Sequence, residues 1–129
     1  MTEDIQLTTD SIDEETLIEY ASQHDTCNGF AFWYLENVNG NALVKDSEFY
    51  GRDHCYVYDP DIDATIDATC AQFQDVDNAP DAWDDMPWAG AWSGDEHPYG
   101  HQRDEIFVWG SREDFEEHWG QYMNGPYIL

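Results

Sequence analysis

Positive charge is almost missing from this sequence. Only 4 Lys and Arg residues stand against 29 Asp and Glu residues, which gives a formal net charge of −25. Nucleic acid and anionic membrane surfaces would repel such a chain, and an enzyme that handles phosphate groups would lack the cationic side chains it needs. We therefore expect no direct contact with nucleic acid or membrane, and we expect the partners to be basic proteins or small cations.

Cysteine is also scarce, and its arrangement excludes two common kinds of small domain. The residues Cys27, Cys55 and Cys70 are odd in number and form no Cys-x-x-Cys pair, which argues against a disulfide framework and against a zinc ribbon. A reducing compartment follows from this usage. The expected location is the cytoplasm, and the host cell cytoplasm if a phage encodes the protein.

Signals for export or membrane insertion are missing as well. Residues 1–4 carry neither the basic segment nor the apolar segment of a secretion signal. No apolar run approaches the roughly 18 residues that a membrane-spanning helix needs. A soluble protein is therefore expected.

The familiar catalytic motifs are absent too. There is no Gly-rich phosphate loop, no G-x-S-x-G and no H-E-x-x-H. His54 and Cys55 are adjacent on a predicted strand, where neighbours point to opposite faces, so they are not expected to form a base and nucleophile pair. With 29 acidic residues, some pair lies at any chosen separation, and a carboxylate dyad carries no information. The sequence predicts that the protein is not an enzyme.

Two segments resemble metal sites without completing one. A segment beginning at Asp59 starts like a calcium loop, but Ala64 replaces the required glycine and Cys70 the bidentate glutamate. An Asp-rich helix N-terminus explains the same residues. His97 and His101 have a spacing that zinc sites use, but no cysteine pair lies near them in sequence, and solvent-facing loop histidines are the alternative. We expect that the protein needs no metal or organic cofactor.

What the chain does have is one uninterrupted run of large apolar residues, from Gly29 to Leu35. Its length and aromatic content predict a central strand covered on both faces, with a buried helical turn as the alternative. The Asn- and Gly-rich segment 37–41 predicts a chain reversal. A strand over 42–50 and another over 54–58 are expected to follow.

Three segments have the capping residues and apolar spacing of amphipathic helices. The first spans 12–24 behind a capping box at Ser11, the second spans 60–76 with an acidic outer face, and the third begins after Ser111. Residues 1–10 are expected to be frayed or to form an edge strand.

Residues 77–104 hold three tryptophans without usable periodicity, which predicts a long, ordered and irregular loop. A final strand is expected over 105–109. The whole chain, residues 1–129, is expected to form a single acidic α+β domain. Its predicted architecture is an antiparallel sheet of about four strands with about three helices packed on it and the long Trp-rich loop.

The acidic residues are spread over the predicted helices and the long loop rather than gathered in a tail. Carboxylates fixed on a folded scaffold imitate the phosphates of duplex DNA, which carries one negative charge per roughly 1.7 Å of axis. Small size, strong acidity, many aromatics and little lysine make the chain resemble the DNA-mimic proteins of phages and plasmids, which include anti-restriction and anti-CRISPR inhibitors and inhibitors of DNA-repair glycosylases. The resemblance covers the whole chain as composition, without a shared motif.

This resemblance implies an inhibitor that evades host defence by occupying the nucleic-acid-binding groove of a basic protein, and a homodimer would imitate a longer stretch of DNA. Two alternatives stay open: a salt-adapted domain of an extreme halophile, and a small enzyme or metal-binding protein with a site that is not visible in the sequence. The carboxylates expected to contact the partner share a rigid anchor and high local charge. They are Asp61, Asp63, Asp67, Asp81, Asp84, Asp85, Asp95, Glu96, Glu113, Glu116 and Glu117.

Overall fold

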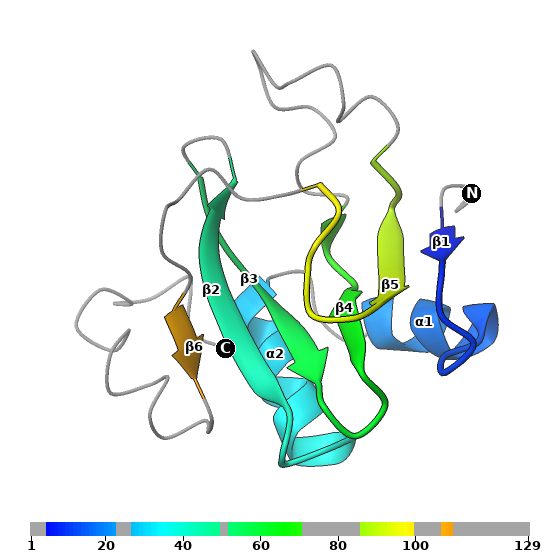
Figure 1. Cartoon of the computed structure of the whole chain (residues 1–129), viewed down its shortest axis with the longest axis horizontal. Helices are drawn as coiled ribbons and strands as arrows, with labels where there is room; N and C mark the ends of the chain where they lie inside the picture. Colours follow the sequence, from blue (N-terminus) through cyan, green and yellow to red (C-terminus); the bar gives the residue numbers. More distant parts are fainter. Residues whose placement is uncertain (1–4, 23–26, 50–51, 71–85, 100–106, 110–129) are drawn as a thin grey trace.

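The computed structural model describes residues 5–22, 27–49, 52–70, 86–99 and 107–109, and Figure 1 shows their arrangement. Within these ranges the chain forms two helices and one 6-stranded sheet, so the predicted α+β class is confirmed. In chain order the elements are β1 (Ile5–Leu7), α1 (Glu14–Ala21), α2 (Cys27–Asn37), β2 (Leu43–Phe49), β3 (Arg52–Asp59), β4 (Ala64–Asp67), β5 (Ala89–Ser93) and β6 (Phe107–Trp109).

The strands lie side by side in the order β1-β5-β4-β3-β2-β6. Neighbouring strands are antiparallel except β1 and β5, which are parallel, so the sheet is mixed rather than purely antiparallel as predicted. The two parallel strands are far apart in the chain, and no local pattern reports their pairing. The predicted strands over 42–50, 54–58 and 105–109 correspond to β2, β3 and β6, and the predicted N-terminal edge strand corresponds to β1.

The apolar run over 29–35, for which the sequence predicts a central strand, forms helix α2 instead. Phe30, Tyr34 and their apolar neighbours are buried around most of the helix. A helix that is apolar on nearly every side has no periodicity that distinguishes it from a buried strand. The chain reversal predicted after it is confirmed, because the side-chain oxygen of Asn39 accepts the backbone N–H of Asn41 at 2.9 Å and shapes a turn into β2.

The helix predicted over 60–76 is wrong in its described part, which forms a tight turn and strand β4, and the remainder lies outside the described residues. Asp59 Oδ1 accepts the backbone N–H of Asp61 at 3.0 Å, so this side chain holds a turn instead of capping a helix. Asp63 has φ 49°, in the left-handed region that a right-handed helix does not contain. β3 and β4 are consequently joined as a hairpin.

Helix α1 confirms the first predicted helix, although it begins later. Asp13 Oδ1 accepts the backbone N–H of Thr16 at 2.7 Å, so Asp13 is the N-cap in place of Ser11. Leu17 is fully buried and fixes the helix on the sheet. The helix predicted after Ser111 lies outside the described residues.

Strand β5 occupies part of the segment predicted to be an irregular loop. Its residues Ala89, Gly90 and Ala91 are small, so they carry little of the apolar signal by which strands are recognised. A Cβ atom at Gly90 would clash with the indole ring of Trp92. Glycine therefore lets the indole fold back over its own strand.

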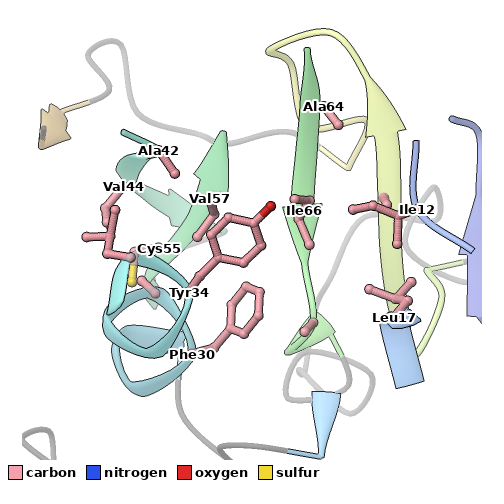
Figure 2. Packing of buried hydrophobic residues seen from close by; sticks show 14 of the residues in the cluster. Ile12, Leu17, Phe30, Tyr34, Ala42, Val44, Cys55, Val57, Ala64 and Ile66 are labelled. Carbon is pink, nitrogen blue, oxygen red and sulfur yellow. The ribbon is translucent and has the colours of Figure 1, made fainter. Parts of the chain in front are cut away.

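The sheet is covered on both faces. On one face α2 packs against β3 and α1 against β5, and Figure 2 shows Phe30 and Tyr34 of α2 beside Val57 and Ile66 of the sheet. Successive residues of a strand point to opposite faces, so Tyr56 faces the other side. There it belongs to a second cluster whose buried members are Tyr56, Cys70, Met86 and Trp92.

Candidate functional site

Three ionisable side chains are buried together next to the second cluster. His54 lies on β3, Asp67 is the last residue of β4, and His97 lies in the segment that follows β5. Their exposed fractions are 1%, 0% and 3%. A charge removed from water is costly unless it is paired and hydrogen-bonded. The partners of the Asp67 carboxylate therefore determine whether this cluster can hold charged groups.

The carboxylate of Asp67 is bonded through both oxygens. Oδ2 lies 2.7 Å from Nε2 of His54 and 2.8 Å from Nε2 of His97. Oδ1 accepts the backbone N–H and the hydroxyl of Thr69 at 3.0 and 3.1 Å. The side chain is therefore held in one orientation, with four donors supplied from three parts of the chain.

The charges of this cluster stabilise each other. Burial alone would raise the pKa of Asp67, but the positive charge of His54 and hydrogen bonds from both histidines hold it well below its usual range. Burial alone would likewise lower the pKa of His54, but the charge and hydrogen bond of Asp67, with a contribution from Cys27, raise it to about 10. At neutral pH the pair is accordingly a carboxylate and an imidazolium.

His97 is fixed from two sides. Its Nδ1 accepts the backbone N–H of Tyr99 at 3.2 Å, so the proton of the neutral ring sits on Nε2 and is donated to Asp67. The rings of Tyr56 and Trp92 lie 4.8 and 4.7 Å from the imidazole, measured between ring centroids. His97 thus bonds the same carboxylate oxygen as His54.

The thiol of Cys27 extends the cluster toward helix α2. Cys27 is the first residue of that helix and packs against the core cluster that includes Cys55, and hydrogen bonding with the side chains of Cys55 and His54 lowers its pKa. Asp67 is bonded to Nε2 of the same His54 ring. A continuous hydrogen-bond path therefore runs from Cys27 through His54 to Asp67.

The surroundings of Cys27 favour its thiolate. A hydrogen bond from the Cys55 thiol, together with the hydrogen bond and charge of His54, holds the pKa of Cys27 well below its usual range, against the opposing effect of burial. A position at a helix N-terminus also favours a thiolate. Cys27 is half-buried, whereas Cys55 and Cys70 are buried, and burial raises the pKa of Cys70. Of the three thiols, Cys27 therefore combines a lowered pKa with the greatest exposure.

The sheet leaves room for this thiol beside β3. β3 pairs with β2 from Arg52 to Tyr58, whereas its ladder with β4 extends only as far as Val57 among the described residues. Beyond that point the backbone N–H of Cys55 is hydrogen-bonded to the thiol of Cys27. The helix N-terminus therefore lies beside a stretch of β3 that has no ladder with β4 among the described residues.

A metal-binding interpretation of the same cluster is disfavoured by its hydrogen bonds. Donor atoms of Asp67, Cys70 and His97 all lie within 4.8 Å of one another, which is close enough for a shared ion. A metal on Nε2 of His97 would need the ring proton on Nδ1, where the backbone N–H of Tyr99 already points. His101, the other member of the predicted zinc spacing, lies outside the described residues.

The carboxylates predicted to contact a partner fall into three groups. Asp61, Asp63, Asp95 and Glu96 are exposed. Asp67 is fully buried, so its predicted position on an exposed face is wrong. The remaining ones lie outside the described residues: Asp81, Asp84, Asp85, Glu113, Glu116 and Glu117.

Comparison with known proteins adds no relative: no family model, no curated protein and no solved structure matches this chain. Neither described helix has the length and apolar character needed to cross a bilayer.

Sequence reasoning missed the path because it considered only neighbours in the chain. His54 and Cys55 do point to opposite faces, but the thiol that reaches His54 belongs to Cys27, in a different element. Recognising this requires α2 to be a helix, since a thiol at the start of a helix is the usual place for an activated cysteine. With α2 taken as a strand, that signal disappears.

Proposed function

We propose that this protein is a cysteine-dependent acyl-transfer enzyme, acting as a hydrolase or as a transferase. The observation that carries the proposal is the hydrogen-bond path from Cys27 through His54 to Asp67. A nucleophile, a base within hydrogen-bond reach and a third group that orients the base are the working parts of such catalysis, whatever their order in the chain. The proposal departs from the sequence-based prediction that the protein is not an enzyme.

The nucleophile is ready before the substrate arrives. The depressed pKa of Cys27 and the raised pKa of His54, about 10, place the proton on the imidazole at neutral pH. The thiolate of Cys27 then attacks the carbonyl carbon of an ester, thioester or amide, and a new C–S bond forms. No proton has to be removed from the thiol during this step.

His54 supplies the proton that the leaving group needs. When the tetrahedral intermediate collapses, the imidazolium protonates the departing alcohol, thiol or amine and becomes a neutral base. The neutral imidazole of His54 then takes a proton from water or from an acceptor molecule, which attacks the thioester and releases Cys27. Asp67 keeps the ring oriented and stabilises the imidazolium in each cycle.

The start of α2 supports the negative charge on the substrate oxygen. Backbone N–H groups in the first turn of a helix have no partner within the helix and point toward its N-terminal end. The helix dipole favours negative charge at the same place. The backbone N–H of Cys27 is accordingly suited to hold the oxyanion, as donors in acyl-transfer enzymes do.

A chromogenic ester tests this function. With p-nitrophenyl acetate, we expect a rapid release of nitrophenolate and an acetyl group on Cys27, located by mass spectrometry of the peptides. Cys27→Ser should abolish both, His54→Gln should abolish turnover, and Glu96→Gln, which changes an exposed carboxylate, should behave as the parent. A full-length, folded protein that acetylates no cysteine, or acetylates Cys70 as readily, would refute the assignment.

A second proposal rests on the surface charge and is compatible with the first. The formal net charge of −25 and the exposed carboxylates of Asp61, Asp63, Asp95 and Glu96 support binding to a basic, nucleic-acid-handling protein as a DNA mimic. Such binding should weaken as salt rises. Displacement of DNA from restriction complexes, CRISPR effectors or repair enzymes at low salt tests it, and failure with every one of them would count against it.

A further inference from the structure

Cys55 takes no part in the bond-making steps of the proposed acyl transfer. Cys55 lies on β3 with its side chain buried in the apolar cluster under α2, and the half-buried Cys27 packs against that same cluster. Figure 2 shows the Cys55 sulfur at the α2 side of the sheet. A hydrogen bond from the Cys55 thiol also lowers the pKa of Cys27, so a partly exposed sulfur and a sheltered one are neighbours in one cluster.

We propose that Cys55 is a resolving thiol, which captures Cys27 in a reversible disulfide when a peroxide oxidises Cys27. This deepens the proposed function, because the disulfide would switch off the nucleophile of the same site. The capture itself does not require acyl transfer, and it therefore can be tested independently of it.

The chemistry balances with hydrogen peroxide as the oxidant. The Cys27 thiolate attacks one peroxide oxygen, the O–O bond breaks, and hydroxide leaves, so that Cys27 becomes a sulfenic acid. The Cys55 thiol gives its proton to that hydroxide, and its sulfur attacks the Cys27 sulfur as the S–O bond breaks. The second hydroxide leaves as water with a solvent proton, and the two thiols have together lost two electrons to the peroxide.

Cys70 is the matched comparison within the chain. It is as buried as Cys55, but its sulfur donates to the backbone carbonyl of Asp67 at 3.6 Å and belongs to the cluster on the other face of the sheet. A sulfenic acid on Cys27 is therefore within reach of Cys55 and is separated from Cys70 by the sheet. Position, and not burial, distinguishes the two thiols.

The disulfide would protect Cys27 from further oxidation as well as inactivate it. A sulfenic acid that finds no thiol is oxidised further to a sulfinic acid, which cellular thiols do not reverse. A disulfide is reduced by thiol exchange at an accessible sulfur, and Cys27 is the more accessible of the two.

The test uses the full chain, hydrogen peroxide and no acyl substrate. After peroxide treatment and alkylation of the remaining thiols, digestion and mass spectrometry should find a Cys27–Cys55 linked peptide, lighter by about 2 Da than the two reduced peptides together and lost on treatment with dithiothreitol. Cys70→Ala should form the same link. Cys55→Ala should instead accumulate a Cys27 product heavier by about 32 Da, which dithiothreitol does not reverse.

Three results would overturn the inference: a parent protein that accumulates the sulfinic acid at Cys27, one whose Cys27 resists peroxide that oxidises free cysteine, or one that links Cys27 to Cys70. If Cys55→Ala does not fold, as judged by circular dichroism, the linked peptide of the parent decides alone. A parent that forms the link and yet acetylates no cysteine would leave this inference standing and refute the proposed acyl transfer.

Discussion

Replacing Asp67 by asparagine separates a catalytic arrangement from a merely structural one. The carboxylate oxygen Oδ2 receives hydrogen bonds from His54 and His97 while Oδ1 receives two from Thr69. An amide has one acceptor oxygen and one NH2 group. Whichever way the new amide is turned, its NH2 group would therefore face donors, and the positive charge of His54 would lose its partner.

The size of the effect follows from the titration of His54. A pKa raised from 6.5 to about 10 corresponds to about 5 kcal/mol in favour of the imidazolium. That figure includes the contribution of Cys27 as well as that of Asp67, and breaking a buried charge pair by removing one partner costs about 3 to 5 kcal/mol of folding free energy. We expect Asp67→Asn to lower the free energy of unfolding by an amount in that range, measured by urea denaturation.

The decisive assay is the rate at which iodoacetamide alkylates Cys27, measured as a function of pH. Without the carboxylate, burial favours a neutral His54, so the thiolate loses its counter-charge and the midpoint of the profile should move to higher pH. The pKa of Cys27 should then rise toward the ordinary range of a free thiol, in which only a small fraction of the groups is thiolate at pH 7, so alkylation at that pH should slow. The hydrogen bond from Cys55 remains, and a loss on the order of tenfold is expected.

The control is Glu96→Gln, which removes one negative charge from an exposed position and should leave both stability and alkylation unchanged. Mass spectrometry of the alkylated peptide confirms that Cys27 is the residue followed. A folded Asp67→Asn protein with the alkylation profile of the parent would refute the claim that Asp67 acts on Cys27 through His54.

The remaining predictions concern His97, the pH range, the β5 packing and salt. His97→Ala should lower the free energy of unfolding by about 1 to 3 kcal/mol because an Asp67 bond is lost, while His97→Gln, whose amide can still donate, should restore most of it and the kcat of the ester assay. The raised pKa of His54 stabilises the fold fully below about pH 6.5, and this contribution should disappear as pH rises through about 10. The depressed pKa of Asp67 stabilises the fold above its ordinary value of 3.8, and this contribution is lost at more acidic pH. Urea midpoints should therefore fall at both acidic and alkaline pH, and midpoints that stay constant above about pH 9 would contradict the ion pair. Gly90→Ala should cost about 1 to 3 kcal/mol, seen as a lower melting temperature, because the new Cβ meets Trp92. A protein folded without molar KCl in a thermal melt would exclude the halophile alternative.

The parts of the fold that were predicted correctly have local causes. Alternating polarity identifies β3, and the capping box at Ser11 marks the start of α1 to within a few residues. The Asn-rich turn before β2 is predicted because the side chain of Asn39 can accept a hydrogen bond from a nearby backbone N–H. In each case the residues that decide the structure lie within a few positions of one another.

The errors have a shared physical origin as well. α2 is buried on most sides, so its sequence has no polar face to reveal a helical period. Asp59 predicts a helix start where the structure has a hairpin, because its side chain can accept a backbone hydrogen bond in either structure. The path from Cys27 to Asp67 depends on three elements packed by tertiary contacts, and no spacing rule brings them together before α2 is recognised as a helix.

The order of elements that carries the path has an evolutionary consequence. Cys27, His54 and Asp67 lie within the consecutive elements α2, β2, β3 and β4, while β1, β5 and β6 lie at or toward the margins of the sheet. Insertions or exchanges in the marginal strands could therefore accumulate in descendants without altering the order of thiol, imidazole and carboxylate along the chain. A distant relative would be recognised by a cysteine that opens a helix, a histidine in the second strand after it and an aspartate at the end of the third, even where the rest of its sequence has diverged.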